Sequence, residues 1–242
     1  MCIRDRCNNC AFVCSHATIR PFLLSEDEVK AAPSNIKLSD TKPKAGEYKF
    51  TMSVSPLDCM GCGECITVCP KAADGAIKMV PQESQAAEQP VFDYLVANVG
   101  KKDSGFADTT PKGSQFNQPL LEFSGSCAGC AETSYARLIT QLFGEQMYIS
   151  NATGCSSIWG NSSPSTPYTT NAKGQGPAWA NSLFEDNAEF GYGMLLAQKA
   201  IRGGLKAKVE DVMNSEKAPE EVKAACKEYL DTFDCGATNG TA

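Results

Sequence analysis

Short stretches of alternating or periodic hydrophobic residues predict the regular elements in the first half of this chain. Tyr48 to Val54 alternates apolar and polar residues, as strands do, and Ile19 to Phe22 is a second strand candidate. Ser25, followed by three acidic residues, predicts a brief helix, because serine caps a helix and acids favour its first turn. Ile77 to Val80 predicts another strand, and Phe92 to Val99 a helix.

The second half shows helical periodicity. A helix is expected to open at Cys130 and to end at Gly144, with an apolar face made by Leu138, Ile139, Leu142 and Phe143. Met147 to Ser150 then predicts a short buried strand. A helix from about Ala188 to Arg202 and a last helix opening at Pro219 complete the pattern.

Between these halves, residues 81 to 120 are polar and rich in Gln, Glu, Lys and Gly. Such a composition is typical of a surface connection between domains. The expected organisation is therefore a first domain over residues 1–80, a connecting segment over 81–120, and a further domain over 121–242.

The strongest chemical signal is a run of cysteines with the spacing C-x2-C-x2-C-x3-C-P, which comprises Cys59, Cys62, Cys65, Cys69 and Pro70. This run binds [4Fe–4S] clusters in bacterial-type ferredoxins, and its fourth cysteine ligates the other cluster of a pair. Glycines inside the loop let it bend around a cluster. A zinc site or paired disulfides would need neither the third spacing nor the proline.

A second run at the N-terminus matches the last three cysteines of the same pattern. Arg4 stands where the first cysteine is expected, and Cys2 lies at the wrong distance. The crossing rule assigns one cluster, A, to Cys7, Cys10 and Cys69, with one ligand missing. It assigns the other cluster, B, to Cys59, Cys62, Cys65 and Cys14.

A third group consists of Cys127 and Cys130 at a helix start and Cys155 after a strand. These residues could supply three of the four ligands of another cluster. The C-x2-C pair alone is also compatible with a redox dithiol of the thioredoxin type.

Composition narrows the class of protein. Ten of the thirteen cysteines fall in these spacings and no signal peptide opens the chain, so we expect reduced thiols and a cytoplasmic location. A net charge of −6 disfavours nucleic acid as a partner, and no apolar stretch is long enough to span a membrane. The single histidine, His16, is expected to be a surface or loop residue beside a cluster.

Three segments together resemble the pyruvate:ferredoxin (flavodoxin) oxidoreductase family. They are KGSQFNQPLLEFSGSCAGCAETSYARLITQLFG, NATGCSSIWG and GPAWANSLFEDNAEFGYGM, in addition to the two N-terminal cysteine runs. The resemblance covers nearly the whole chain from Cys7. It implies an internal fragment: an α+β ferredoxin-like two-cluster domain, followed by an incomplete α/β thiamine-diphosphate-binding domain.

The resemblance also implies roles for individual residues. Cys127, Cys130 and Cys155 would hold a cluster close to thiamine diphosphate, which Glu132 and Cys155 would also contact. The family's fourth ligand and its magnesium motif are not found in these 242 residues. Ser15 stands where the family usually has proline.

The activity implied is the oxidative decarboxylation of pyruvate to acetyl-CoA, with electrons passing through three [4Fe–4S] clusters to ferredoxin or flavodoxin. The cofactors would be thiamine diphosphate and Mg²⁺, and the full enzyme would be a homodimer. The isolated chain is expected to be inactive. The alternatives are another 2-oxoacid:ferredoxin oxidoreductase, or an electron carrier without catalysis, which would not need the residues after Gly113.

Overall fold

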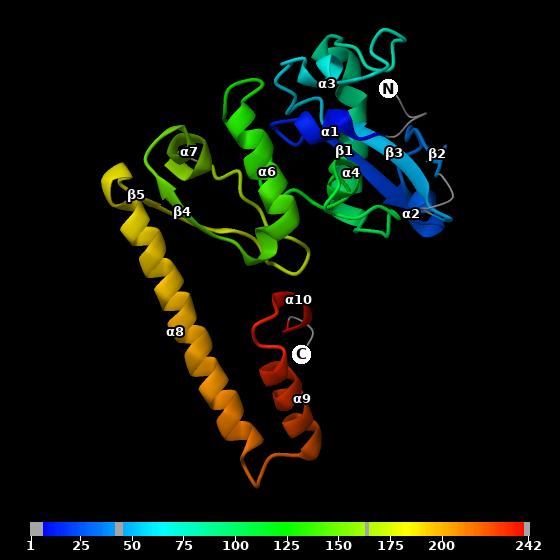
Figure 1. The fold of residues 1–242 in the computed structure, drawn as a ribbon. Coiled ribbons are helices and arrows are strands. Elements are labelled where there is room, and N and C mark those ends of the chain that lie inside the picture. The colour runs from blue at the N-terminus through cyan, green and yellow to red at the C-terminus, as the bar shows by residue number, and fades with distance from the viewer. Residues whose placement is uncertain (1–6, 42–45, 163–164, 240–242) are drawn as a thin grey trace. The chain divides into compact units, whose positions relative to one another are not determined.

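The computed structural model describes residues 7–41, 46–162 and 165–239. Their contacts divide the chain into two compact units, one ending at Asn181 and one starting at Ser182 (Figure 1). This division lies well beyond the boundaries expected near residues 80 and 120. It does so because the helix that follows Cys130 packs on the elements that carry the N-terminal cysteines.

The first unit contains two small sheets and several short helices. In chain order its elements are α1 (Asn9–Val13), β1 (Ile19–Leu24), α2 (Glu26–Ala31), β2 (Ser39–Asp40), β3 (Lys49–Val54), α3 (Glu64–Thr67), η2 (Gln82–Glu88), α4 (Gln89–Asn98), α5 (Pro111–Ser114), α6 (Ala131–Phe143), η3 (Gly144–Gln146), β4 (Tyr148–Ala152), α7 (Cys155–Ser157), η4 (Ile158–Ser162) and β5 (Ala178–Ser182).

The larger sheet has the strand order β1-β3-β2, and both pairs are antiparallel. Ile19 pairs with Val54 and Leu24 with Lys49, so the two strands predicted from alternation are confirmed. Pro21 is tolerated because β1 is an edge strand, where a missing N–H need not break a ladder. The predicted helix after Ser25 is also confirmed, and Ser25 and Glu28 form a reciprocal capping box.

Apolar residues are buried on both sides of this sheet. Phe50 and Met52 pack with Ile19 on one side. On the other, Leu24 meets Val91 and Leu95 of α4, whose predicted existence is confirmed. Figure 1 shows α4 beside β1. The segment 81–120 therefore contributes a helix to the core of the first unit, in addition to surface loop.

The strand expected at Ile77 to Val80 is wrong. These residues form a bend and irregular backbone. Ile77 does pack against the core, but Met79 and Val80 are exposed, and this segment pairs with no strand of the larger sheet. A short apolar run predicts that part of a segment is buried, but it does not decide whether the segment pairs with a strand.

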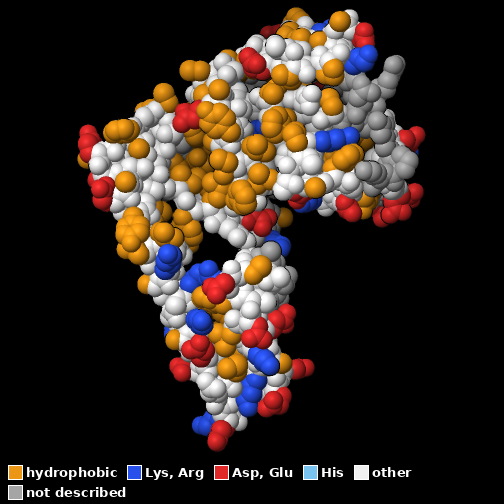
Figure 2. Space-filling view, viewed as in Figure 1, with side chains coloured by type: hydrophobic (Ala, Val, Ile, Leu, Met, Phe, Trp, Pro, Cys, Tyr) orange, Lys and Arg blue, Asp and Glu red, His pale blue; other side chains and the backbone are white. Residues whose placement is uncertain are grey.

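Helix α6 has the predicted ends, with Gly144 as its C-cap, but the predicted apolar face is wrong. Its buried residues are Thr133, Arg137, Thr140 and Gln141, all polar. Ile139 and Phe143 are 45% and 63% exposed, and Figure 2 shows hydrophobic side chains gathered over this part of the surface. The strand after α6 exists as β4, although it is only partly buried.

The second unit is helical. It consists of η5 (Phe184–Asp186), α8 (Asn187–Met213), α9 (Glu220–Asp231) and α10 (Gly236–Asn239). Both predicted helices are confirmed, and α8 runs well past the expected end at Arg202. The Arg202 guanidinium donates a hydrogen bond to the Phe233 carbonyl oxygen and lies over the Phe233 ring, which ties α8 to the chain after α9.

Candidate metal centre

The first cysteine run forms a loop that leads into α3. Gly61 and Gly63 adopt φ values of 68° and 82°, in the left-handed region that favours glycine. These two residues turn the backbone around the loop, as the sequence predicts. Cys59 and Cys62 are exposed, whereas Cys65 and Cys69 are half-buried.

The N-terminal run lies on and around α1. Asn8, which precedes the helix, also adopts a left-handed backbone, and its side-chain amide donates a hydrogen bond to the Lys112 carbonyl oxygen. This bond fixes the start of α1 against α5. Arg4 and Cys2, which bear on the missing ligand, lie outside the described residues.

Electrostatic coupling groups the cysteines of the two runs. The pKa of the Cys10 thiol is raised to about 12, mainly by burial; a backbone hydrogen bond to Ala11 lowers it, and the charges of Cys7, Cys65 and Cys69 add to the increase. The pKa of Cys65 is raised to about 11, first by burial and then by the charges of Cys14, Cys62 and Cys59.

Each neighbourhood therefore draws cysteines from both runs. The group around Cys10 holds Cys7 and Cys69, and the group around Cys65 holds Cys14, Cys59 and Cys62. These are the residue sets that the crossing rule predicts for clusters A and B. Cys65 belongs to both neighbourhoods, so the two groups adjoin each other at this residue. Ligation itself stays a prediction.

The donor set suits a cluster. All seven residues are thiols, the ligands that iron–sulfur clusters use, and the mutual repulsion of their charges would be relieved by bound iron. Across the described ranges, no three Cys, His, Asp or Glu side chains are placed so as to hold one metal ion.

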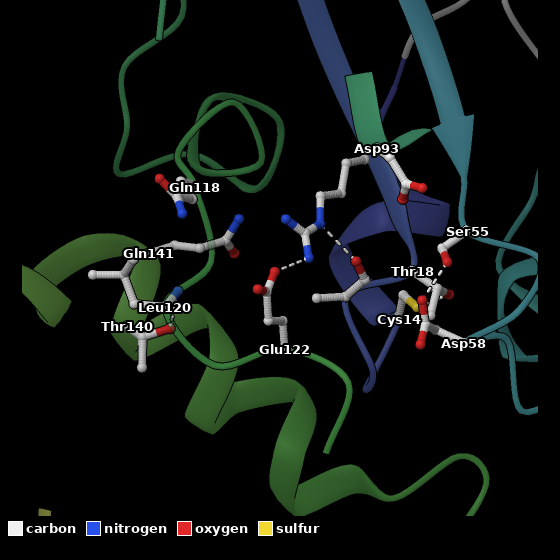
Figure 3. Close-up of polar contacts among 12 residues, drawn as sticks. Cys14, Thr18, Ser55, Asp58, Asp93, Gln118, Leu120, Glu122, Thr140 and Gln141 are labelled. Carbon is white, nitrogen blue, oxygen red and sulfur yellow. Dashed lines mark hydrogen bonds and ion pairs between the residues drawn. The ribbon is translucent and has the colours of Figure 1, made fainter. Parts of the chain in front are cut away.

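Polar contacts fix the backbone around these thiols. The Cys14 sulfur lies 3.2 Å from the Thr18 hydroxyl, and Ser55 donates a hydrogen bond to Asp58 just before Cys59 (Figure 3). Glu122 forms an ion pair with Arg20 of β1, which links the chain before the third cysteine group to the larger sheet (Figure 3).

The third cysteine loop lies directly against the first. Gly129, between Cys127 and Cys130, has a φ of 72°. A Cβ placed on it would stand 3.4 Å from the Cys62 Cβ and 3.7 Å from the Glu64 Cγ. These are ordinary contact distances, so the loop of Cys127 and Cys130 adjoins the group that contains Cys62, and the positive φ is what favours glycine at this position.

His16 holds the same loop from the other side, and the expectation of a surface histidine is wrong. The side chain is 3% exposed. Its Nδ1 lies 3.0 Å from the Ser124 carbonyl oxygen and its Nε2 lies 3.2 Å from the Cys127 carbonyl oxygen. The only sequence signal for this role is its position two residues after Cys14, because both partners are more than a hundred residues away.

Cys155 opens α7 and is exposed. Its convergence with Cys127 and Cys130 stays a prediction. Glu132 lies in the first turn of α6, as expected. The pKa of the Tyr168 phenol is raised to about 12, first by burial and then by the Glu132 charge, which places this carboxylate near Tyr168. The Tyr168 ring in turn packs against Trp159, with ring centroids 6.5 Å apart.

A cavity of about 570 Å³ lies elsewhere in the first unit. It is lined by parts of β1, α4 and α6 and by the segments 115–120 and 171–173, and none of its lining residues is a cysteine. No helix among the described residues is long and apolar enough to cross a membrane.

Known proteins match this chain closely. The family described as "4Fe-4S dicluster domain" matches residues 1–73, the part that holds the first two cysteine runs. The first unit thus contains a ferredoxin-like dicluster domain. The third cysteine group lies beyond this match.

Longer relatives cover nearly the whole chain. A pyruvate-flavodoxin oxidoreductase of Klebsiella pneumoniae is 54% identical over 96% of the chain. A pyruvate:ferredoxin oxidoreductase of Moorella thermoacetica is 49% identical over 93%. A protein named pyruvate dehydrogenase [NADP(+)] in Cryptosporidium parvum is 50% identical over 89%. The chain spans only 19%, 19% and 11% of these relatives' own lengths.

Proposed function

Because the chain is homologous over nearly its whole length to one segment of the pyruvate-flavodoxin and pyruvate:ferredoxin oxidoreductases, we propose that it is the electron-transfer segment of such an enzyme. The enzyme oxidatively decarboxylates pyruvate to acetyl-CoA and delivers the electrons to ferredoxin or flavodoxin. The observation that carries the proposal is the adjacency of three cysteine groups within one compact unit.

The contacts support an order for the cysteine groups along the path of the electrons. Gly129 places the third group against Cys62, which belongs to the group of Cys65. Cys65 adjoins the group of Cys10. The path therefore runs from the Cys127 loop, through the residues around Cys65, to those around Cys10. The Cys10 group is the proposed exit to the external carrier.

Thiamine diphosphate takes up the electrons left when carbon dioxide departs, and [4Fe–4S] clusters carry them away singly. In this chain Cys127, Cys130 and Cys155 would hold the cluster nearest that cofactor. Glu132 would contact the cofactor from the first turn of α6, where the positive end of the helix dipole favours a carboxylate. The remaining cluster ligand, the Mg²⁺ site and the residues that bind coenzyme A belong to other segments of the enzyme.

The names of the relatives bear on which part of the enzyme selects the final electron acceptor. Closely similar segments occur in proteins named for flavodoxin, ferredoxin and NADP(+). We therefore assign the choice of final acceptor to residues outside the part that these proteins share.

The complete enzyme that contains this segment tests the proposal. It should reduce ferredoxin or flavodoxin when pyruvate and coenzyme A are both supplied, whereas the 242-residue chain alone should not. Cys62→Ser should abolish reduction of the carrier but leave thiamine diphosphate binding intact. Carrier reduction at the unaltered rate by the Cys62→Ser enzyme would rule out the proposed route.

A second variant tests the cofactor side. Glu132→Gln should weaken thiamine diphosphate binding and leave the iron content unchanged. Loss of iron with normal cofactor affinity would place Glu132 in support of the cluster instead. Glu145→Gln, at the far end of α6, is a matched control.

A further inference from the structure

One charged side chain is buried between the third cysteine group and the first two. Arg137 extends from α6 and is 2% exposed. Its Nη1 donates hydrogen bonds to the side-chain oxygens of Gln115 and Gln141, at 2.9 and 2.7 Å. Its Nη2 donates to the Phe12 carbonyl oxygen of α1 at 2.6 Å. The guanidinium therefore reaches into the N-terminal cysteine run.

This charge has no carboxylate partner among the described residues. The hydrogen bonds of the guanidinium all go to neutral oxygens, and Nε has no partner among the described residues. Burial lowers the pKa of Arg137 to about 10, which still leaves it charged at neutral pH. Neutral oxygens offset the burial of such a charge only in part, so a nearby anion would stabilise it.

The candidate anion is Cys14, whose sulfur would be a thiolate once it ligates iron. Phe12, which accepts the Nη2 bond, lies two residues before Cys14 in the same run. A thiolate charge at Cys14 acts to hold the Arg137 proton, whereas the nearby Arg20 acts against it. Arg20 already has its own counter-charge in Glu122, so the two cations differ in what neutralises them.

We propose that Arg137 is the buried counter-charge of the cluster held through Cys14 and that it raises the reduction potential of that cluster. This inference rests on the proposed function, because it requires that the cluster binds. Reduction adds one negative charge to the cluster. A fixed cation in a medium of low dielectric constant stabilises the reduced state more than the oxidised state. The same helix begins directly after the loop of Cys127 and Cys130, so α6 joins that loop to the residue that tunes the neighbouring cluster.

The test measures the potential by an EPR-monitored redox titration of the anaerobically reconstituted 242-residue chain. A Cys69→Ser background limits the signal to the cluster of Cys14, Cys59, Cys62 and Cys65. Failure of this background chain to bind iron would contradict the proposed function, which separates that failure from failure of the present inference.

Two substitutions then separate charge from packing. Arg137→Gln removes the charge. At a fixed solution potential, the ratio of reduced to oxidised cluster should then fall at least about tenfold. This fall corresponds to a negative shift of about 59 mV in the reduction potential of a one-electron couple. Arg137→Lys keeps the charge but lacks the planar fork, and it should retain most of the original potential. The matched control is the double variant Arg20→Gln with Glu122→Gln, which removes a neutralised pair and should leave the potential unchanged.

An unchanged potential in Arg137→Gln overturns the inference, as does an equal negative shift in Arg137→Lys. If Arg137→Gln loses the cluster altogether, the lysine variant decides. Retention of the cluster with the original potential in Arg137→Lys supports a role for the charge. Loss of the cluster in both variants overturns the inference, because it shows that the Arg137 guanidinium serves only to join α6 to α1.

Discussion

Cys10 and Cys65 hold their protons more tightly than an ordinary cysteine does. Burial is the main cause for both, and the charges of neighbouring cysteines add to it. Because metal ligation requires thiolates, iron binding at these residues must release protons. At the residue scale, these two half-buried thiols are thus the ones at which iron must displace the most tightly held protons.

The first prediction concerns thiol reactivity in the iron-free chain. Because the thiolate is the nucleophile, Cys10 should be alkylated last, and the exposed Cys59 and Cys62 early. Iodoacetamide labelling at pH 8, followed by peptide mass spectrometry, gives the order. Cys235, exposed and outside the three loops, is the control and should react early. Labelling of Cys10 as fast as Cys59 would contradict the prediction.

The second prediction concerns alkaline pH and Tyr168. The pKa of this phenol is about 12 in the folded chain and about 10 when unfolded. Below pH 10 both states keep the proton, so this group adds no pH dependence. Between pH 10 and 12 the unfolded state loses its proton first, so the free energy of unfolding should fall as pH rises.

Denaturant unfolding of the iron-free chain across this pH range checks the prediction. Tyr168→Phe should flatten the decline, and the exposed Tyr135→Phe serves as the matched control. Glu132→Gln should lower the Tyr168 pKa, because one of its two causes is removed, but burial should keep it above 10. An unchanged Tyr168 titration in Glu132→Gln would mean that the two groups do not interact.

At the scale of elements, α6 buries polar residues and exposes apolar ones, which is the reverse of the usual pattern for a helix at a protein surface. Its polar residues face the rest of the first unit and form hydrogen bonds there. The Gln141 side-chain amide donates to the Asn117 carbonyl oxygen, and the Thr140 hydroxyl accepts from the Leu120 amide. Tyr135, Ile139 and Phe143 are left exposed. The side of α6 that carries Arg137 is thereby fixed by hydrogen bonds, which specify one orientation.

The third prediction concerns the short helix α5, which supports Asn8 through the Lys112 carbonyl oxygen. A Cβ on Gly113 would stand 2.1 Å from the Ala107 carbonyl oxygen, too close for any relaxation of a side chain alone. Gly113→Ala should therefore destabilise the chain by about 3 kcal/mol, the upper part of the usual range for overpacking. Thermal or denaturant unfolding measures the loss.

Gly100→Ala is the matched control, since a Cβ there meets nothing within 4 Å. It should change stability by no more than about 1 kcal/mol, and in the stabilising direction if the backbone accepts alanine. Equal effects of the two substitutions would contradict the predicted close approach of α5.

At the scale of the whole molecule, each of the two N-terminal cysteine runs contributes one cysteine to the group formed mainly by the other run. Cys14 lies with the group of Cys65, and Cys69 with the group of Cys10. The loop of Cys127 and Cys130 contacts Cys62 and Glu64 through Gly129, so it adjoins the group that contains Cys62. If the three predicted clusters bind, the cluster of Cys14 is therefore expected to be the central one.

The fourth prediction tests this arrangement by iron analysis and EPR. The reconstituted chain should load the cluster of Cys14 and leave the other deficient, because Arg4 replaces a ligand. Arg4→Cys should add about four iron atoms, one further cubane. In that background Cys14→Ser should affect the cluster of Cys59, Cys62 and Cys65, and Cys69→Ser the other. The opposite pattern of loss would reverse the assignment.

Local rules were enough for much of this protein. The spacing of seven cysteines, the capping box at Ser25 and the left-handed turns at Gly61 and Gly63 depend on residues a few positions apart. Strands β1 and β3 followed from alternation, and the ends of α6 from its flanking residues. Such features are determined by the sequence itself, because each partner lies within one turn or one strand.

Other features depended on which distant surfaces meet. Ile77 to Val80 is a strand candidate by sequence but pairs with no strand of the larger sheet, and His16 is buried only because the chain near Cys127 returns to it. The polar face of α6 is buried because Gln115 and Phe12 offer oxygens there. Sequence periodicity reports hydrophobic burial, whereas hydrogen bonds between residues more than twenty positions apart are decided by the tertiary structure alone.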